Sequence, residues 1–503
     1  MRKTTLALTI GALLAAAAAP AQADDLWEVY QQAVQNDPTF LQAYSNYQAQ
    51  QENAPIARGA YFPNITLSGR RTVQRSSGDQ PQFTSGGFVD TTISSHDYNT
   101  VYTAQLTQAI FDWTAWSGIE QASAQVAQAE ANFQAAQQDL ILRVATAYFD
   151  VLNARDTLAA DHAAKDALSK QLEQAKEKYE VGMSAITDVQ EAQAAYDQAV
   201  ADEITAQQQV VNSEESLRAI TGRESAELKE PSVDMPLRSP EPNNAQQWVD
   251  QALKQNPNLL AAQSGADAAS AAVGVQRGQH LPNLSLVLSH NKNDDKQNGT
   301  ISAAGLGTQQ FNNPSNFNTN TAYLQLSWPI WNGGSSWARV NQAQYQYQAA
   351  LDQVKITTRQ TEKQARTAFI GVLSGISQVE ALKQSVKSNE TSMDATETGL
   401  QVGTRTIVDV LTARQNLLKA QTGFANARYT YLKNVLTLKQ AAGILTEADV
   451  KQMNVMLQES APVSQPAMTA APTGGTMAAP ASATSPVPAA MTVNPPEGTP
   501  PRK

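Results

Sequence analysis

The sequence predicts a mixed fold, in which long coiled-coil helices carry a membrane-spanning β-barrel and the whole unit occurs twice in the chain. Three observations lead to this fold class. Short motifs recur about 220 residues apart, two long tracts without proline follow a heptad, and a pair of alternating strands precedes each tract. Repeats of this length exceed solenoid units of about 20–50 residues, so they indicate two copies of a complete module.

The duplication is visible as motifs that keep their order in both halves. The matched pairs are Asn36-Asp37-Pro38 with Gln255-Asn256-Pro257, Phe62-Pro63-Asn64 with Leu281-Pro282-Asn283, Val181-Gly182 with Val402-Gly403, and Thr221-Gly222 with Ala442-Gly443. We therefore expect a first repeat at 24–224 and a second at 245–445, joined by the proline-rich segment 225–244.

The two long tracts predict helical hairpins at 113–221 and 334–442. Both lack proline and are rich in good helix formers, and their apolar positions follow a heptad with alanine at every other seam position. A helix from about Thr114 to Glu180 would be roughly 100 Å long at 1.5 Å per residue. Gly182 and Gly403 end one helix before a tight return into the next, which places the tips near 181–188 and 402–409.

Each repeat also contains a predicted β-hairpin, at 61–111 and 281–331. Strands at 61–77, 98–111, 281–292 and 320–331 alternate between apolar and polar residues, and they flank the polar segments 78–97 and 293–319. Such alternation suits a barrel wall between lipid and water. A soluble β-sandwich is the alternative, but it does not explain why hairpins interrupt such long helices.

Four strands are too few to close a barrel, and an open sheet in lipid would leave its edges unpaired. Eight strands form about the smallest closed barrel. The chain must therefore oligomerise, and the residues by themselves allow a dimer of eight strands or a trimer of twelve.

The N-terminus predicts a secretory signal peptide at 1–23, with the charged residues Arg2 and Lys3, an apolar run and the cleavage motif Ala21-Gln22-Ala23. Its removal leaves 34 basic and 46 acidic residues, which disfavours a nucleic-acid partner. There is no cysteine, and no later apolar stretch of about 18 residues that could span a bilayer as a helix. The Pro- and Ala-rich tail 462–503 is expected to be disordered.

Several longer motifs resemble the TolC family of outer-membrane channel-tunnels (outer membrane efflux proteins), in particular its enterobacterial type. The most specific is Val402-Gly403-Thr404-Arg405-Thr406-Ile407-Val408-Asp409-Val410-Leu411, and strong companions are Ala185-Ile186-Thr187-Asp188-Val189-Gln190 and Gln105-Leu106-Thr107-Gln108-Ala109-Ile110-Phe111-Asp112. The resemblance implies a homotrimer with a twelve-stranded β-barrel in the outer membrane and a twelve-helix periplasmic α-barrel that tapers shut. Segments 225–244 and 446–461 would form its equatorial region.

The resemblance also implies a function. The trimer would be a passive exit duct of tripartite efflux pumps and type I secretion systems, which docks onto a periplasmic adaptor protein and an inner-membrane transporter of RND, ABC or MFS type. The adaptor would dock at the hairpin tips, at Val181, Gly182, Met183, Val402, Gly403 and Thr404. Substrates, host and the particular transporter are not determined by the sequence.

At the closed end, the resemblance implies a latch between subunits. Arg405 would pair with Asp188 and Thr187 of a neighbouring subunit, and Asp409 would form an acidic ring at the constriction. Alternatively, Arg405 is an ordinary surface charge and the two aspartates serve only the helix dipole. The chain departs from the family pattern at Leu400, where the family has a tyrosine that bonds the latch aspartate, and at Thr412, where it has a second acidic ring.

Two other classes of function compete with a duct. An enzyme is disfavoured because the four histidines have no metal-ligand spacing and no nucleophile or phosphate-binding motif occurs, so we expect no cofactor and no metal. A trimeric structural or adhesive outer-membrane stalk without transport would share the coiled coils. A transmembrane conductance distinguishes the duct from the stalk.

Overall fold

The computed structural model describes residues 24–84, 87–224, 227–231, 235–303, 307–455 and 457–458. The predicted signal peptide at 1–23 and the predicted disordered tail at 462–503 lie outside the described residues. None of the helices in these ranges combines the length and the apolar character needed to cross a membrane.

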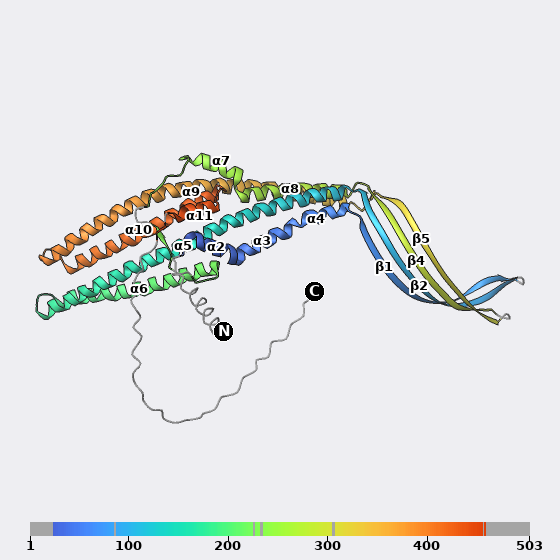
Figure 1. Ribbon diagram of the computed structural model, residues 1–503, viewed down its shortest axis with the longest axis horizontal. Helices are drawn as coiled ribbons and strands as arrows, with labels where there is room; N and C mark the ends of the chain where they lie inside the picture. Colours follow the sequence, from blue (N-terminus) through green and yellow to red (C-terminus); the bar gives the residue numbers. More distant parts are fainter. Residues whose placement is uncertain are drawn as a thin grey trace, which may run out of the picture. The chain divides into compact units, whose positions relative to one another are not determined.

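The first repeat begins with short helices and continues into a β-hairpin and two long helices (Figure 1). Asp25 caps α2 and Asp37 caps α3 by accepting hydrogen bonds from backbone N–H groups of the first turn. Asp112 does the same for α5, which starts directly after the second strand. The elements are α2 Leu26–Asn36, α3 Pro38–Gln51, α4 Asn53–Arg58, the 3₁₀ turn η2 Gly59–Tyr61, β1 Asn64–Thr84, β2 Gly87–Phe111, α5 Trp113–Glu180 and α6 Ile186–Thr221.

The second repeat follows the same order after the short strand β3. Asn256 caps α8 as Asp37 caps α3, and in both cases proline occupies the first helical position, where its missing N–H costs nothing. The elements are β3 Glu230–Pro231, α7 Ala245–Gln255, α8 Pro257–Gly278, β4 Asn283–Ala303, β5 Gly307–Ser327, α9 Ser335–Gln401, α10 Ile407–Ala441, α11 Glu447–Asn454 and β6 Leu457–Gln458.

The long helices α5 and α9 contain 68 and 67 residues, and the shorter helices pack along them. Near the sheet, α3 and α4 lie against α5, while α8 lies between α5 and α9 (Figure 1). Towards the tips, α6 pairs with α5 and α10 packs against both α9 and α5. The chain thus presents four helical segments near the sheet and four near the tips, a width that results from the duplication.

The four long strands form one antiparallel sheet in the order β1-β2-β4-β5. The pairing of β2 with β4, for example Leu106 with Leu288, joins the two repeats. One irregularity in the register falls between Ala109 and Phe111, where β2 approaches the start of α5. β1 and β5 are the edges of the sheet, and each has a strand partner on one side only.

The prediction that 78–97 and 293–319 connect shorter strands was wrong. Both segments continue the ladder, so that β1 pairs from Asn64 with Thr107 to Thr84 with Gly87, and β4 pairs from Asn283 with Ser327 to Ala303 with Gly307. Their Ser, Thr, Asn and Gln side chains resemble a loop composition, but the ladder is made by the backbone and tolerates them. The last strand ends earlier than predicted, at Ser327, two residues before Pro329, which has no N–H to donate.

The largest apolar core lies where α2, α5 and α10 meet the segment between the repeats. Tyr148, Phe149 and Tyr429 are fully buried at its centre. The hydroxyl groups of the two tyrosines are hydrogen-bonded: Tyr148 donates to the carbonyl of Lys229 at 2.7 Å, and Tyr429 donates to Asp156 Oδ2 at 2.8 Å. Burial raises the pKa of both phenols well above the ordinary value, so the two tyrosines remain neutral.

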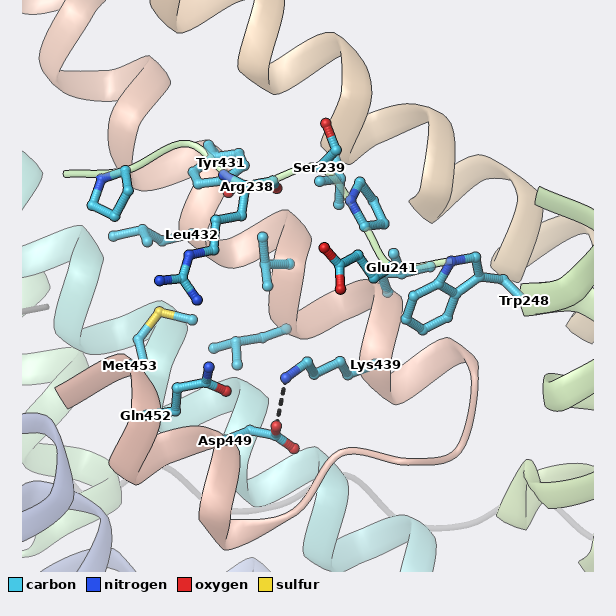
Figure 2. A pocket seen from close by; sticks show the side chains of 16 residues that line it. Arg238, Ser239, Glu241, Trp248, Tyr431, Leu432, Lys439, Asp449, Gln452 and Met453 are labelled. Atoms are coloured by element: carbon cyan, nitrogen blue, oxygen red, sulfur yellow. Dashed lines mark hydrogen bonds and ion pairs between the residues drawn. The ribbon is translucent and has the colours of Figure 1, made fainter. Parts of the chain in front are cut away.

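A cavity of about 380 Å³ opens at the edge of this core, between residues 236–241 and the helices α10 and α11 (Figure 2). Its floor is apolar and its rim carries charged side chains, of which Lys439 and Asp449 form an ion pair.

The two repeats end with the same contact. Gly222 follows α6 and lies against Asn36, while Gly443 follows α10 and lies against Gln255 and Asn256. Both glycines have a positive φ, of 72° and 75°, as expected for the residue that ends a helix. At Gly443 a Cβ atom would collide with the backbone carbonyl of Gln255, so this glycine is required for two reasons.

We predict that Gly443→Ala lowers the stability of the oligomer more than Gly333→Ala. Gly333 also has a positive φ, of 69°, but nothing lies within 4 Å of its Cβ position, so the matched variant should cost only about 1–2 kcal/mol of backbone strain. Urea unfolding followed by helical circular dichroism measures both. Equal losses in the two variants would contradict the packing role of Gly443.

Candidate functional site

The tips of the two helical hairpins are built by the same backbone device. At the first tip, the N–H of Gly182 donates to Tyr179 O at 2.9 Å and the N–H of Met183 donates to Lys178 O at 2.7 Å. At the second, Gly403 donates to Leu400 O at 3.2 Å and Thr404 to Gly399 O at 2.9 Å. This is the Schellman pattern, which needs a left-handed residue. Gly182 and Gly403 supply it, with φ of 75° and 76°.

The tips differ in how the returning helix begins. Thr406 and Asp409 form a capping box at α10: Asp409 Oδ2 accepts from the N–H and the hydroxyl of Thr406, both at 2.9 Å, and Asp409 N–H donates to Thr406 Oγ1 at 3.3 Å. At α6 the capping residue is Ala185, which has no side-chain acceptor. Asp188 instead accepts a 2.5 Å hydrogen bond from Ser184 Oγ.

Asp409 is held in its ionised form by these contacts. The backbone N–H and the hydroxyl of Thr406 lower the pKa of Asp409 below its ordinary value, and the nearby charge of Arg405 adds to the effect. Its position in the first turn of α10 also favours a carboxylate through the helix dipole. The second tip therefore carries a negative charge at neutral pH.

Arg405 is exposed and lies against the last turn of α9. A Cβ atom on Gly399 would be only 2.7 Å from Arg405 Cγ, so the glycine makes room for the arginine stem. Backbone N–H of Arg405 also donates to Gly399 O at 3.2 Å. Within the described residues of one chain, Arg405 forms no ion pair with Asp188 and no hydrogen bond with Thr187. The single chain thus presents the predicted latch residues on separate tips.

The remaining predicted tip residues form two small apolar knobs. Val181, Met183 and Val402 expose 70%, 78% and 69% of their surface. Leu400 and Thr412 both lie close to the second tip, at the end of α9 and the start of α10. Leu400 has no side-chain donor or acceptor, so it cannot hydrogen-bond Asp188.

The structure adds a contact that sequence reasoning missed. Leu172, Ala175, Val189 and Ala192 form a small buried cluster between α5 and α6, and Ile407 packs against it. The first residue of α10 therefore touches the first hairpin, which couples the two tips. The heptad pattern identifies the seam of each hairpin but not which other helix covers it.

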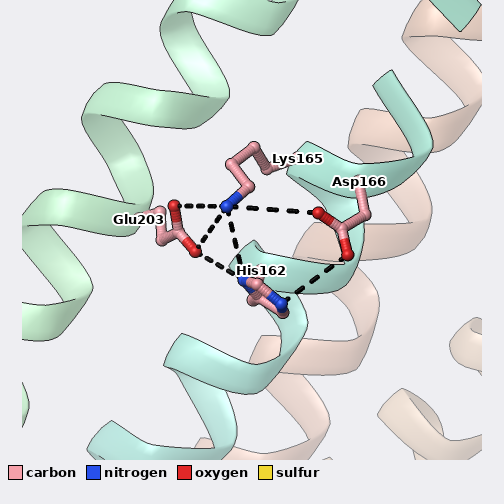
Figure 3. Close-up of polar contacts among 4 residues, drawn as sticks. All are labelled: His162, Lys165, Asp166 and Glu203. Atoms are coloured by element: carbon pink, nitrogen blue, oxygen red, sulfur yellow. Dashed lines mark hydrogen bonds and ion pairs between the residues drawn. The ribbon is translucent and has the colours of Figure 1, made fainter. Parts of the chain in front are cut away.

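A polar cluster further from the tip also joins α5 to α6 (Figure 3). Glu203 of α6 is buried and accepts from His162 Nδ1 at 2.6 Å and from Lys165 Nζ at 2.9 Å. Asp166 Oδ2 faces the other ring nitrogen of His162 at 3.6 Å. Among the described residues no group of His, Asp and Glu is arranged to hold a metal ion. We call the contact of His162, Lys165 and Asp166 with Glu203 the electrostatic clasp.

The clasp lowers the pKa of Glu203. Burial by itself raises this pKa, but the hydrogen bonds from His162 and Lys165 outweigh burial and bring it below the ordinary 4.5. A carboxyl group with a depressed pKa stabilises the fold above its unfolded pKa, and this stabilisation is lost as the pH falls through the folded pKa.

We predict that Glu203→Gln destabilises the first hairpin by about 1 kcal/mol at neutral pH. The difference from the unmodified chain should begin to shrink as the pH falls below about 4.5 and should disappear only below the lower pKa of the folded state, where the carboxyl group is protonated in both folded and unfolded states. Urea titrations at several pH values measure it, with the exposed Glu191→Gln on the same helix as the control. A difference that persists unchanged in acid would refute the electrostatic origin of the clasp.

Comparisons with known proteins agree with this architecture. The sequence matches the family described as outer membrane efflux protein over residues 29–223 and 248–444. It is 36% identical over 463 residues to the outer membrane protein TolC of Escherichia coli, covering 92% of this chain and 90% of the relative. It is 29% identical over 429 residues to the alkaline protease secretion protein AprF of Pseudomonas aeruginosa, covering 85% and 86%.

Among solved structures, the outer membrane protein VceC of Vibrio cholerae is similar with a TM-score of 0.67 at 20% identity, over 83% of this chain and 96% of that one. The two matched sequence segments coincide with the two repeats, and the resemblance seen in the tip motifs extends over almost the whole chain. The predicted fold class, family and outer-membrane location are confirmed. The chain belongs to the outer membrane efflux protein family.

Proposed function

We propose that three copies of the chain form one continuous duct, which docks at its helical tips onto a periplasmic adaptor and an inner-membrane transporter. The chain is an outer-membrane channel for efflux and type I secretion, as its family and relatives indicate. The main observation in support of a trimeric duct is the four-stranded sheet, which has two open edges and is attached to a layer of four helical segments.

The faces of the sheet support a barrel wall. Residues paired across the strands point to the same face, so the register places Ile65, Leu106, Leu288 and Ala322 in one row. The next position along gives Thr66, Gln105, Ser289 and Thr321 on the opposite face. An apolar face towards lipid and a polar face towards water fit a transmembrane wall near the helices.

The edges then require further copies of the chain. Pairing β1 of one subunit with β5 of the next satisfies the backbone groups that each edge leaves open, and lipid offers them no other partner. Three copies give a twelve-stranded barrel and twelve helical segments at each level, as the resemblance implies. The exposed Trp113, Trp116, Trp328, Trp331 and Trp337 lie at the junction of strands and helices, where an interfacial aromatic belt would be.

At the closed end, Arg405 would meet Asp188 and Thr187 of the neighbouring subunit. The proposal is supported by an exposed guanidinium that is free of ion pairs to these residues in its own chain. The carboxylate of Asp188 already accepts a hydrogen bond from Ser184, so in the latch it would accept from both Ser184 and Arg405. A charge-assisted contact of this exposed kind is worth about 1 kcal/mol, and threefold symmetry repeats it. Such a closed state can be opened by a docking partner.

The partner surface would be the two glycine tips. Exposed Val181, Met183 and Val402 provide apolar area, while Gly182 and Gly403 allow close approach of another backbone. Asp409 from three subunits would form the acidic ring, and Thr412 supplies no second ring. The relatives include an efflux protein and two protease secretion proteins, which supports both efflux and protein secretion.

We predict that Arg405→Ser raises the open probability or conductance of single channels in a planar bilayer. Losing three contacts of about 1 kcal/mol each would shift the closed–open equilibrium by roughly a hundredfold. The control is Arg359→Ser, which removes an exposed charge of α9 at a distance from the tip. Currents equal in both variants and the unmodified channel would exclude the Arg405 latch, and no current from an inserted oligomer would favour the structural stalk.

We also predict that Asp409→Asn weakens block of the channel by hexaamminecobalt by about tenfold or more, because the ring loses its three charges. The complementary variant Thr412→Asp, which adds a second ring one turn further along α10, should strengthen the block. Conductance titrated with the cation measures both. Undiminished block in Asp409→Asn would show that the cation binds elsewhere.

A further inference from the structure

The cavity at the edge of the core is a concave site that lies away from the tips. It is lined by residues 236–241 on one side and by α10 and α11 on the other (Figure 2). Leu432 and Leu436 on α10, Met453 on α11 and Trp248 on α7 are each at most 6% exposed and form an apolar floor. Its volume of about 380 Å³ lies at the lower end of the range for small-molecule sites.

The walls of the cavity are held in place by hydrogen bonds. The buried hydroxyl of Tyr431 accepts from the backbone N–H of Arg238 at 2.9 Å and donates to its carbonyl at 3.0 Å, which fixes the rim at Arg238. Trp248 Nε1 donates to Pro242 O at 2.8 Å and fixes the other end of the same segment. A cavity whose walls are already ordered binds a ligand without the cost of ordering them.

Two charged groups at the mouth are left without partners. Lys439 and Asp449 satisfy each other at 2.5 Å. In contrast, the guanidinium of Arg238 and the carboxylate of Glu241 form no ion pair or hydrogen bond with any described residue. Figure 2 shows them apart, with Arg238 reaching towards Met453 and Gln452 and Glu241 on the side of Trp248. The mouth therefore has a positive end and a negative end above an apolar floor.

We propose that this cavity binds a small amphipathic organic anion with one acidic group. Its carboxylate would pair with Arg238, whose planar fork matches a carboxylate in two hydrogen bonds. Its apolar body, of about two fused rings, would lie on Leu432, Leu436 and Met453 and extend towards Trp248. Glu241 would repel a second acidic group at the far end, which selects monoanions over dianions.

The site is distinct from the proposed duct entrance. It lies on the segment that joins the repeats and on α10 and α11, whereas the tip residues lie at the opposite end of α10. An occupied cavity would tie the joining segment to α10 and α11, and so stabilise the seam between the two repeats. The inference does not depend on the latch or on the acidic ring.

The test is equilibrium dialysis of 2-naphthoate against the full-length oligomer in detergent. We expect one ligand per chain, and affinity at least about tenfold weaker in Arg238→Gln, because the ion pair is lost. Arg238 is exposed, so the substitution leaves the core intact. Arg359→Gln is the control for uptake by detergent and for loss of a surface charge, and it should bind as the unmodified chain does. The dianion 2,6-naphthalenedicarboxylate should bind more weakly than 2-naphthoate, and Glu241→Gln should reduce that discrimination.

A second variant tests the position of the apolar body. Met453→Trp fills the floor and should abolish binding while the oligomer keeps its helical content. Equal binding by the unmodified chain and Arg238→Gln would overturn the proposal, as would unchanged binding in Met453→Trp or no saturable binding at all. If Glu241→Gln leaves the preference for 2-naphthoate over the dianion unchanged, the assigned orientation of the ligand, with its apolar body towards Glu241, would be overturned.

Discussion

The unpaired edges of the sheet are the constraint on which the rest of this molecule depends. One chain supplies four strands, so β1 and β5 each leave one row of backbone groups without a partner. In water such edges can be hydrated, but within a bilayer only another strand can satisfy them. Closure therefore has to come from other copies of the chain. In the trimer proposed above, the helices and every charge at their tips would be repeated three times, so a weak contact in one subunit would act three times.

Duplication explains how one chain can supply both a regular wall and an irregular entrance. The two repeats share their caps, their Schellman turns and the glycine contacts that end α6 and α10. They diverge at the tips, where Ala185 and Ser184 stand opposite Thr406 and Arg405. The backbone is thus conserved between copies, while one tip gains a capping box and a cation. This difference makes the two tips chemically unequal, as two identical hairpins would not be.

The stability of the chain is unevenly distributed along its helices. Large aromatic and aliphatic side chains are buried together around Tyr148 and Tyr429, near the joining segment. Towards the tips the buried apolar residues are fewer and mostly alanine, apart from the small cluster at Leu172 and Val189. There the clasp around Glu203 and the contact of Ile407 add to a limited apolar area. A region held by few apolar contacts can open locally while the core remains folded.

Sequence periodicity determined the existence and length of the long helices, because a heptad and a glycine stop are local properties of the chain. The alternation of apolar and polar residues also predicted the strands near the helices, and the motifs at the tips indicated the family. Periodicity misjudged residues 78–97 and 293–319, because ladder bonds are made by backbone groups and depend on the register with a distant strand. Three features were decided only by tertiary structure: the partners of Glu203, the packing of Ile407 on the first hairpin, and the cavity beside Arg238. Each brings together side chains that lie tens or hundreds of residues apart in the sequence.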